Sequence, residues 1–335
     1  GIPRIDFSDD SDGALLLENS ATNLIPYSEA LNISYAPTNM TQTSDYGTSP
    51  DGSLTSTRLV LDNLTDSRSF NNTSLVNGTE YTFSAYYKGV SGEKTYMYFL
   101  SSTGGTTLSK EITFNGNWQR ESITFTAGSV SNYTYIVDVR QGASTATDFE
   151  VWGASLEENS YSTSYIKTVG TAQTRVADTA NGAGNSTVIN SSEGTLYAEI
   201  SALNSVTSPS SYITISDGTY NNRASILFSS GGTNQIRTFL RVGGATQIDV
   251  SDNVSDVTDF NKIAFSYKLN DFKVYINGTL VSSDTSGSVW SADTITKLSF
   301  SEINTNSGAF NGKTKSVQVY TTALSDAELI SLTTI

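Results

Sequence analysis

The chain has 335 residues, 37% of them hydrophobic and only 16% charged, and its 33 acidic and 19 basic residues give a net charge of −14. It contains no cysteine and no histidine, which excludes disulfide bonds, thiol nucleophiles, histidine-based catalytic triads and the usual zinc sites. The acidic balance offers no basic stripe to nucleic acid or to an anionic membrane, and no apolar run approaches the roughly 18 residues of a membrane span. The 18 tyrosines, 14 phenylalanines and abundant turn residues predict an all-β protein.

In chain order, residues 1–25 include the apolar run Ala14–Leu17, typical of a buried strand, and residues 26–52 are rich in loop-forming types. Strand signals then recur at close spacing from residue 53 to residue 158. Tyr81, Phe83 and Ala85, for example, alternate as expected for the buried face of one strand. Seven short strands separated by turns predict a jelly-roll sandwich. The predicted strands are Leu54–Leu61, Tyr81–Gly89, Thr95–Leu100, Lys110–Phe114, Gln119–Thr126, Thr134–Val139 and Asp148–Leu156.

Small polar residues dominate residues 159–192, where strand periodicity fades. This stretch predicts a connector between a first domain, residues 1–158 with the N-terminal strand included, and a second domain, residues 193–335. A second series of strands follows. These strands are Thr195–Ala202, Tyr212–Ser216, Ala224–Phe228, Ile236–Val242, Gln247–Val250, Lys262–Leu269, Phe272–Ile276, Thr279–Ser283, Lys297–Ser301 and Lys313–Tyr320.

Two hairpins and one helix have explicit local signals. Asn270-Asp271 and Asn277-Gly278 each separate two predicted strands, and Asn-Gly is the strongest short hairpin signal. Ser325 followed by Glu328 forms a capping box before apolar residues, which predicts one short C-terminal helix.

Several motifs of the first half resemble phage virion and tail-fibre proteins. They are Pro3-Arg4-Ile5-Asp6, Leu15–Glu18 and Thr22–Glu29 at the start, then Trp152–Glu157, Thr163–Ile166 and Thr174–Asp178. The module that they enclose is similar to jelly-roll carbohydrate-binding modules. Relatives often have proline where this chain has Lys167, which predicts a less rigid connector here.

The second half resembles the concanavalin A-like, laminin-G-like lectin fold. The motifs are Phe272–Gly278, Phe310–Gly312 and Val317–Leu329. Together the two resemblances imply tandem antiparallel sandwiches, a jelly roll followed by a concanavalin A-like domain. They define the architecture well and the ligand poorly, because such sandwiches serve many functions.

Catalysis is not expected. Glycosidases of the concanavalin A-like fold carry closely spaced carboxylates on one strand, typically Glu-x-Asp-x-x-Glu, and no such pattern occurs. Adjacent Glu157 and Glu158 point to opposite faces of a strand, so they cannot flank one bond.

One metal site is implied by the jelly-roll resemblance, because those modules often hold a structural calcium between the first and last strands. The matching positions are Glu18, Asp148 and Asn23. The alternative is that these carboxylates are ordinary solvated side chains.

Sugar binding requires aromatic platforms beside amide and charged hydrogen-bonding groups. The segment Tyr220, Asn221, Asn222 and Arg223 follows the Asp217-Gly218 turn and combines these types, although a polar hairpin tip has the same composition. Further candidate platforms are Trp290, in the loop 286–293, and Tyr46, in the long loop of the first domain, whereas Trp118 and Trp152 are expected in the core.

These observations favour a non-enzymatic adhesin that recognises a cell-surface glycan as a fibre, tail or decoration of a virion. The expected location is therefore a virion or a cell surface, and fibre proteins are commonly trimeric, so a homo-oligomer is expected for the parent protein. Other virion proteins are the second expected class of partner, and neither nucleic acid nor membrane insertion is expected. Two alternatives stay open: a structural virion protein that uses these folds in assembly, and a targeting fragment of a polysaccharide-degrading enzyme.

Overall fold

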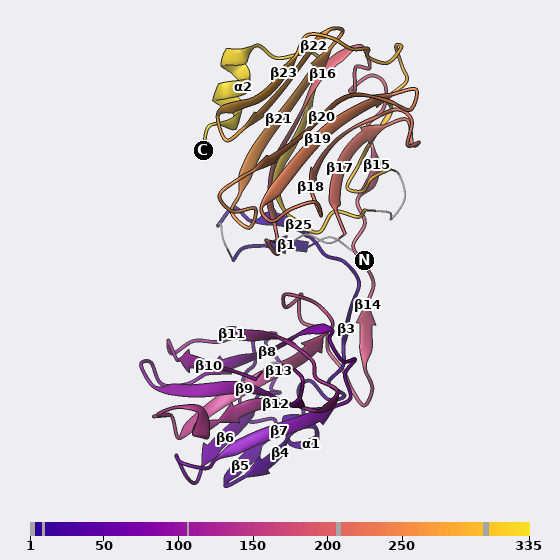
Figure 1. Cartoon of the computed structure of the whole chain (residues 1–335). Coiled ribbons are helices and arrows are strands. Elements are labelled where there is room, and N and C mark those ends of the chain that lie inside the picture. The colour runs from indigo at the N-terminus through magenta and orange to yellow at the C-terminus, as the bar shows by residue number, and fades with distance from the viewer. Residues whose placement is uncertain (1–3, 9–10, 106, 206–208, 304–307) are drawn as a thin grey trace. The chain divides into compact units, whose positions relative to one another are not determined.

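The computed structural model describes residues 4–8, 11–105, 107–205, 209–303 and 308–335. The chain divides into two compact units, each built from antiparallel sheets (Figure 1). Unit 1 comprises Gly1–Asn19 and Val176–Ile335, and unit 2 comprises Ser20–Arg175. Among the described residues, no helix has the length and apolar character needed to cross a membrane.

Unit 2 is a sandwich of two five-stranded sheets around an aromatic core. Phe99 of one sheet stacks on Phe125 of the other with ring centroids 3.4 Å apart. Tyr81, Phe83 and Ala85 are all buried in this core, as their alternation predicts. One sheet has the order β10 (Leu108–Thr113), β9 (Lys94–Thr103), β12 (Val130–Asp138), β7 (Arg68–Thr73), β4 (Ala36–Thr38); the other has the order β11 (Gln119–Thr126), β8 (Glu80–Lys88), β13 (Asp148–Glu157), β6 (Thr57–Leu61), β5 (Met40–Thr43).

Short elements complete unit 2. Helix α1 spans Leu31–Ser34, a single 3₁₀ turn spans Val139–Gln141, and β3 (Ala21–Asn23) pairs with β14 (Gln173–Arg175). All seven predicted strands of this half are confirmed, Gln119–Thr126 with identical ends and the other six with shifted ends, but β4, β5 and β7 are additional strands. Their polar sequences, such as Arg68-Ser69-Phe70-Asn71-Asn72-Thr73 in β7, lack the alternation that identifies a half-buried strand.

Unit 1 is a second sandwich, whose aliphatic core lies between a seven-stranded and a six-stranded sheet. Leu196 and Ile263 of the first sheet and Ile213 and Ile226 of the second are completely buried there. The larger sheet has the order β1 (Arg4–Asp6), β2 (Ala14–Leu17), β25 (Gly312–Tyr320), β16 (Glu193–Ala202), β21 (Asn261–Lys268), β22 (Asp271–Ile276), β23 (Thr279–Asp284); the smaller has the order β15 (Asn181–Ala183), β24 (Lys297–Ser299), β17 (Ser211–Ser216), β18 (Arg223–Phe228), β19 (Gln235–Val242), β20 (Ala245–Asn253).

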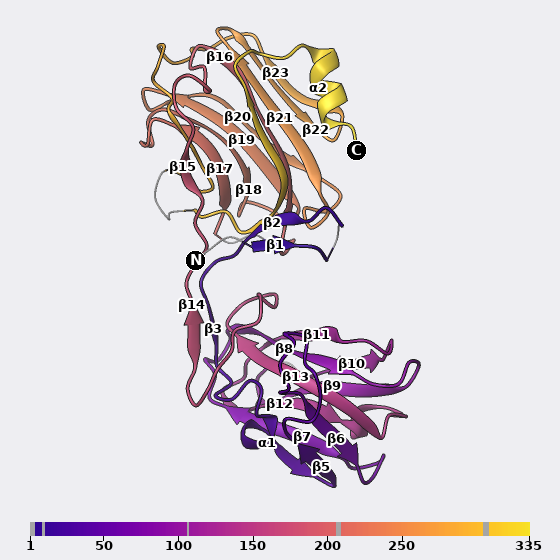
Figure 2. The same cartoon turned by 180° about the vertical axis from the view of Figure 1, so that it is seen from behind.

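The N-terminal strands do not belong to the jelly roll, so the assignment of residues 1–25 to the first domain is wrong for β1 and β2. Strand β2 pairs with β25, with Leu15 opposite Thr314, and Figure 2 shows both N-terminal strands beside the strands of unit 1. Leu17 is 1% exposed in the core of unit 1. A short apolar strand indicates burial, but its sequence does not indicate which sheet it joins.

The predicted connector of residues 159–192 is likewise divided. Residues up to Arg175 belong to unit 2, and residues from Val176 onward belong to unit 1. Strand β15 lies within this stretch and pairs with β24, so the boundary of unit 1 precedes residue 193. Lys167 lies in the part of this stretch that belongs to unit 2, with its Nζ 2.7 Å from the Glu29 carboxylate, and the lower rigidity expected from the missing proline stays a prediction.

Local signals were accurate in unit 1. The Asn277-Gly278 hairpin is confirmed, and both residues have the positive φ that this two-residue turn requires. The turn before β22 is shifted by one residue, to Leu269-Asn270, because Lys268 pairs with Asp271. Helix α2 (Asp326–Thr333) begins at the predicted capping box, with the Ser325 N–H 2.8 Å from the Glu328 carboxylate.

Candidate functional site

The outer face of the six-stranded sheet of unit 1 carries a cluster of arginines. In β19, Ile236 and Leu240 point into the core, so alternation places Arg237, Phe239 and Arg241 on the opposite side. Arg223 of β18 pairs directly with Arg241 across the ladder, and therefore joins the same face. We call Arg223, Arg237, Phe239 and Arg241 the guanidinium face.

Phe239 lies at the centre of the guanidinium face. The guanidinium carbons of Arg223, Arg237 and Arg241 lie 4.9, 5.3 and 5.7 Å from the centroid of its ring. Guanidinium groups are attracted to aromatic faces and are weakly hydrated, so they tolerate this crowding better than ammonium groups would. The ring itself is 3% exposed because the arginines cover it.

Two of the three guanidinium groups are neutralised by carboxylates. Arg237 binds Asp249 through two nitrogens, at 2.7 and 2.5 Å, and Arg223 lies 2.9 Å from Glu302. Among the described residues, Arg241 has no ion pair, and its buried Nε atom and that of Arg223 have no hydrogen-bond partner. The face therefore has more cationic donors than anionic acceptors, although the chain as a whole is strongly acidic.

An exposed tyrosine stands at the rim of this face. Tyr220 is 45% exposed, and its ring centroid lies 5.0 Å from the Arg223 guanidinium carbon. The turn below it is held by Asp217, which accepts hydrogen bonds from the Thr219 N–H at 2.7 Å and the Asn222 amide at 2.8 Å. Burial raises the pKa of Asp217, but these hydrogen bonds outweigh it and the pKa is lowered overall.

The predicted loop residues thus have different roles. The Arg223 guanidinium packs against the exposed Tyr220 ring, but Arg223 itself is only 3% exposed, so it supports this ring and does not face a ligand as predicted. The Asn222 side chain is engaged within the protein, because it also accepts the Gly243 N–H at 2.8 Å. The exposed Asn221 fixes the neighbouring turn through its carbonyl oxygen, 2.9 Å from the Gly244 nitrogen.

Trp290 is not an exposed platform, so that prediction is wrong. It is 3% exposed in the core of unit 1, its indole N–H donates to the Arg241 carbonyl oxygen at 2.7 Å, and its ring packs edge-on against Tyr267. Conversely, Trp118 is only half-buried and donates to the Thr48 carbonyl, whereas Trp152 is 2% exposed as expected.

Arg237, Phe239 and Arg241 were not predicted as site residues, although the sequence contains a signal for them. Arg-x-Phe-x-Arg within Gln235–Val242 has the period of a strand face, with apolar residues between. The sequence pattern was used only to predict a strand over Ile236–Val242.

The predicted calcium ligands have separate partners. Glu18 lies 2.6 Å from Arg4 in unit 1, and Asp148 binds Arg58 in unit 2. Asn23 is fully buried, and its amide bonds four backbone groups, which leaves no position for a metal. Within the described part of the chain, no group of three or more acidic side chains is arranged to hold an ion. These contacts do not support Glu18, Asn23 and Asp148 as one site, and calcium binding stays a prediction.

Comparisons with known proteins identify the fold of the second half. Residues 177–330 match the family model described as the concanavalin A-like lectin/glucanases superfamily. The fold of unit 1 is therefore concanavalin A-like, as the sequence motifs of that half imply. No curated protein sequence matches the chain.

Solved structures similar to this chain include three from different sources. One is the CBM40 domain of the Ruminococcus gnavus IT-sialidase, with 19% identity, a TM-score of 0.37, and coverage of 46% of this chain and 94% of that one. Another is domain 4 of AbnA, an extracellular GH43 arabinanase from Geobacillus stearothermophilus solved with arabinotriose (14%, TM-score 0.37, 49% and 73% coverage). The third is a heptameric SAP-like pentraxin from Limulus polyphemus (12%, TM-score 0.35, 45% and 72% coverage).

Proposed function

We propose that unit 1 binds a glycan that carries a carboxylate or sulfate group, and that the guanidinium face with Tyr220 is its binding surface. The observation that carries this proposal is the excess of guanidinium donors around Phe239 beside an exposed aromatic ring. The match of residues 177–330 to a superfamily that includes lectins supports a sugar as the ligand class.

Each part of the surface has a distinct chemical role in this proposal. The exposed ring of Tyr220 stacks against the apolar face of a sugar. Arg241, the guanidinium group with no ion pair among the described residues, binds the acidic substituent, for which its planar donor pairs are suited. Arg223 and Arg237 are already paired with carboxylates, and they pack against the covered Phe239 ring.

The biological setting that we propose is attachment to a cell surface, as an extracellular or virion-borne adhesin without catalytic activity. The association with phage fibres rests on the sequence motifs of residues 3–29 and 152–178 alone. The proposal includes a homo-oligomer, with a trimer as the first state to test, because several weak binding sites that act together give useful avidity.

The test compares matched acidic and neutral glycans on an array, followed by titration of the best ligand. A hydrogen bond to a charged group contributes about 1.5–3 kcal/mol, so Arg241→Gln is expected to weaken binding by about 10- to 100-fold. Raising the salt concentration should weaken binding further, because the ion pair is partly exposed.

Arg68→Gln in unit 2 is the matched control, since it removes the same charge far along the chain from the guanidinium face. Equal binding of acidic and neutral glycans, or unchanged affinity in a folded Arg241→Gln variant, would refute the proposal. Binding to no glycan at all would favour the alternative role in protein assembly.

A further inference from the structure

A separate cleft opens on unit 2, beside the exposed Tyr46. Its volume is about 220 Å³, less than the roughly 300–1,000 Å³ of pockets for drug-sized ligands. It therefore has room for one small ring rather than an extended chain. Its lining residues are Tyr46, Lys88, Gly89, Val90, Asp148, Phe149 and Glu150, which we call the Tyr46 cleft.

The wall that carries Tyr46 is fastened to the sheet below it. The Gly47 N–H donates to the Ser56 hydroxyl at 2.8 Å, and this hydroxyl donates to the Glu150 carboxylate at 2.5 Å. A Cβ atom at position 47 would lie 2.2 Å from the Glu150 carboxylate oxygen, so any larger residue would push this carboxylate aside. The Trp118 indole N–H fixes the next residue of the loop by donating to the Thr48 carbonyl oxygen at 3.0 Å.

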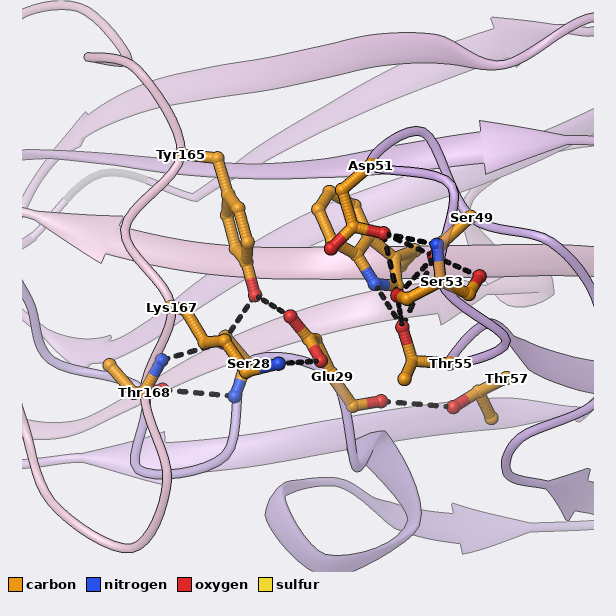
Figure 3. Close-up of polar contacts among 11 residues, drawn as sticks. Ser28, Glu29, Ser49, Asp51, Ser53, Thr55, Thr57, Tyr165, Lys167 and Thr168 are labelled. Atoms are coloured by element: carbon orange, nitrogen blue, oxygen red, sulfur yellow. Dashed lines mark hydrogen bonds and ion pairs between the residues drawn. The ribbon is translucent and has the colours of Figure 1, made fainter.

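Farther along the same loop, a hydroxyl network makes the wall rigid (Figure 3). Ser49 donates to Asp51 at 2.8 Å, the Ser53 N–H donates to Asp51 at 2.9 Å, and the Trp152 indole N–H donates to Thr55 at 2.9 Å. A loop held at this many points is a preformed wall rather than a lid, and a preformed site avoids the entropic cost of ordering upon binding.

A second network in Figure 3 fixes the chain segment that follows β13. Glu29 accepts hydrogen bonds from the Tyr165 hydroxyl at 3.0 Å and from Lys167 at 2.7 Å. Thr168 and Ser28 exchange two hydrogen bonds, at 2.9 and 3.0 Å. These bonds hold the segment after β13 to Ser28 and Glu29, within the same unit as the cleft.

The charges in the cleft cancel in pairs. Arg58 binds Asp148, with Nε 2.8 Å from the carboxylate, and this bond holds the pKa of Asp148 below its usual value. Lys88 lies 3.7 Å from Glu150 and also lies over the Trp118 ring. Because each cation has its own anion, the cleft does not select a charged ligand, but it presents several donors and acceptors to hydroxyl groups.

Tyr46 supplies the remaining feature of a sugar site. Its ring is 47% exposed, and the Arg58 guanidinium lies 4.9 Å from the ring centroid, which fixes the ring while leaving part of it free. Tyr220 of unit 1 has the same arrangement with Arg223, at 5.0 Å and 45% exposure. The two units thus present equivalent aromatic platforms in different charge environments.

We propose that the Tyr46 cleft binds one neutral sugar ring, stacked on Tyr46 and hydrogen-bonded to Lys88, Asp148 and Glu150. The cleft and the guanidinium face lie in different units, so this site does not depend on the function proposed for unit 1. The chain would then carry two sugar sites with different ligand preferences.

Saturation-transfer NMR on the full chain tests the proposal, with the methyl glycosides of glucose, galactose, mannose and N-acetylglucosamine as probes. At least one probe should receive saturation, and Tyr46→Ala should weaken its binding by about 3- to 10-fold, the scale of one aromatic contact. Gly47→Ala should weaken it as well, by displacing the Glu150 carboxylate without touching the ring.

Ile330→Ala is the control, because it removes a side chain of similar exposure, 45%, from α2, which belongs to neither proposed site. It should leave binding of the neutral probe unchanged, and Tyr46→Ala should leave binding of acidic glycans unchanged. The proposal is wrong if none of the four probes receives saturation, or if a folded Tyr46→Ala variant binds the probe as the native chain does. Either result leaves the proposal for the guanidinium face intact.

Discussion

Asn23 is completely buried and makes four hydrogen bonds to backbone groups of unit 2, so its replacement should destabilise that unit strongly. Its amide nitrogen donates to the carbonyl oxygens of Ala154 and Ile166 at 3.0 and 2.9 Å. Its amide oxygen accepts the N–H groups of Ile25 and Leu156 at 3.0 and 3.1 Å. One side chain therefore joins the N-terminal segment of unit 2 to β13 and to the segment after it.

The four hydrogen bonds set the expected magnitude for Asn23→Ala. At about 1 kcal/mol net for each bond, the free energy of unfolding should fall by about 4 kcal/mol. For a unit of this size, 1 kcal/mol shifts the melting temperature by about 2–4 °C, so the transition of unit 2 should move down by about 8–16 °C. Asn23→Asp should be at least as harmful near neutral pH, because it places a carboxylate oxygen against two carbonyl oxygens.

Differential scanning calorimetry of the full chain measures the shift, and hydrogen exchange assigns the transition to unit 2. Asn117→Ala is a suitable control, since Asn117 is exposed and surface changes of this kind usually alter stability by less than about 0.5 kcal/mol. A shift of less than about 2 °C in Asn23→Ala would refute the argument. Calcium-dependent stability that is lost in Asn23→Ala but kept in Asn23→Asp would instead indicate that Asn23 is a metal ligand, because a carboxylate also binds calcium.

Two further predictions concern unit 1. Trp290→Ala should lower the free energy of unfolding of unit 1 by about 3–5 kcal/mol, because the substitution leaves a cavity in the core. Tyr220→Ala should change this free energy little, because Tyr220 is exposed. Thermal unfolding of the two variants measures the difference. Acid should loosen α2, because hydrogen bonds from Lys273 and Ser325 lower the pKa values of Asp326 and Glu328. This stabilisation is complete at pH values above the unfolded-state pKa values of 3.8 for Asp326 and 4.5 for Glu328, and it is lost as the pH falls through the lowered pKa values of the folded state. NMR of the backbone amides of α2 measures the loss. An α2 helix that is unchanged at pH 2 would contradict the prediction.

Features encoded by neighbouring residues could be predicted from the sequence. The turn at Asn277-Gly278 and the helix start at Ser325 depend on backbone preferences and on contacts within four residues, so their motifs were sufficient. The alternation of Tyr81, Phe83 and Ala85 likewise indicated the face of β8 that enters the aromatic core, although Thr82 and Ser84 on the other face are buried as well.

Features that depend on distant partners could not be predicted in the same way. Trp290 lies in a loop by sequence, and only the Arg241 carbonyl oxygen and the Tyr267 ring explain its burial. The guanidinium face requires knowing that β18 and β19 are neighbours and that Arg223 is paired with Arg241. The local sequence contains the Arg-x-Phe-x-Arg pattern, but it contains neither of these two facts about strand pairing.

The division of unit 1 into two chain segments has a consequence for its synthesis. Unit 2 is a continuous segment, so it can fold as soon as Arg175 has left the ribosome. Strand β2 must wait for β25, because Leu15 pairs with Thr314, about 300 residues later. At about 5–20 residues per second, β2 remains without its partner for roughly 10–30 s after unit 2 is complete. A nascent chain that stalls before Gly312 would therefore expose this apolar strand as an open edge, where association with other chains begins.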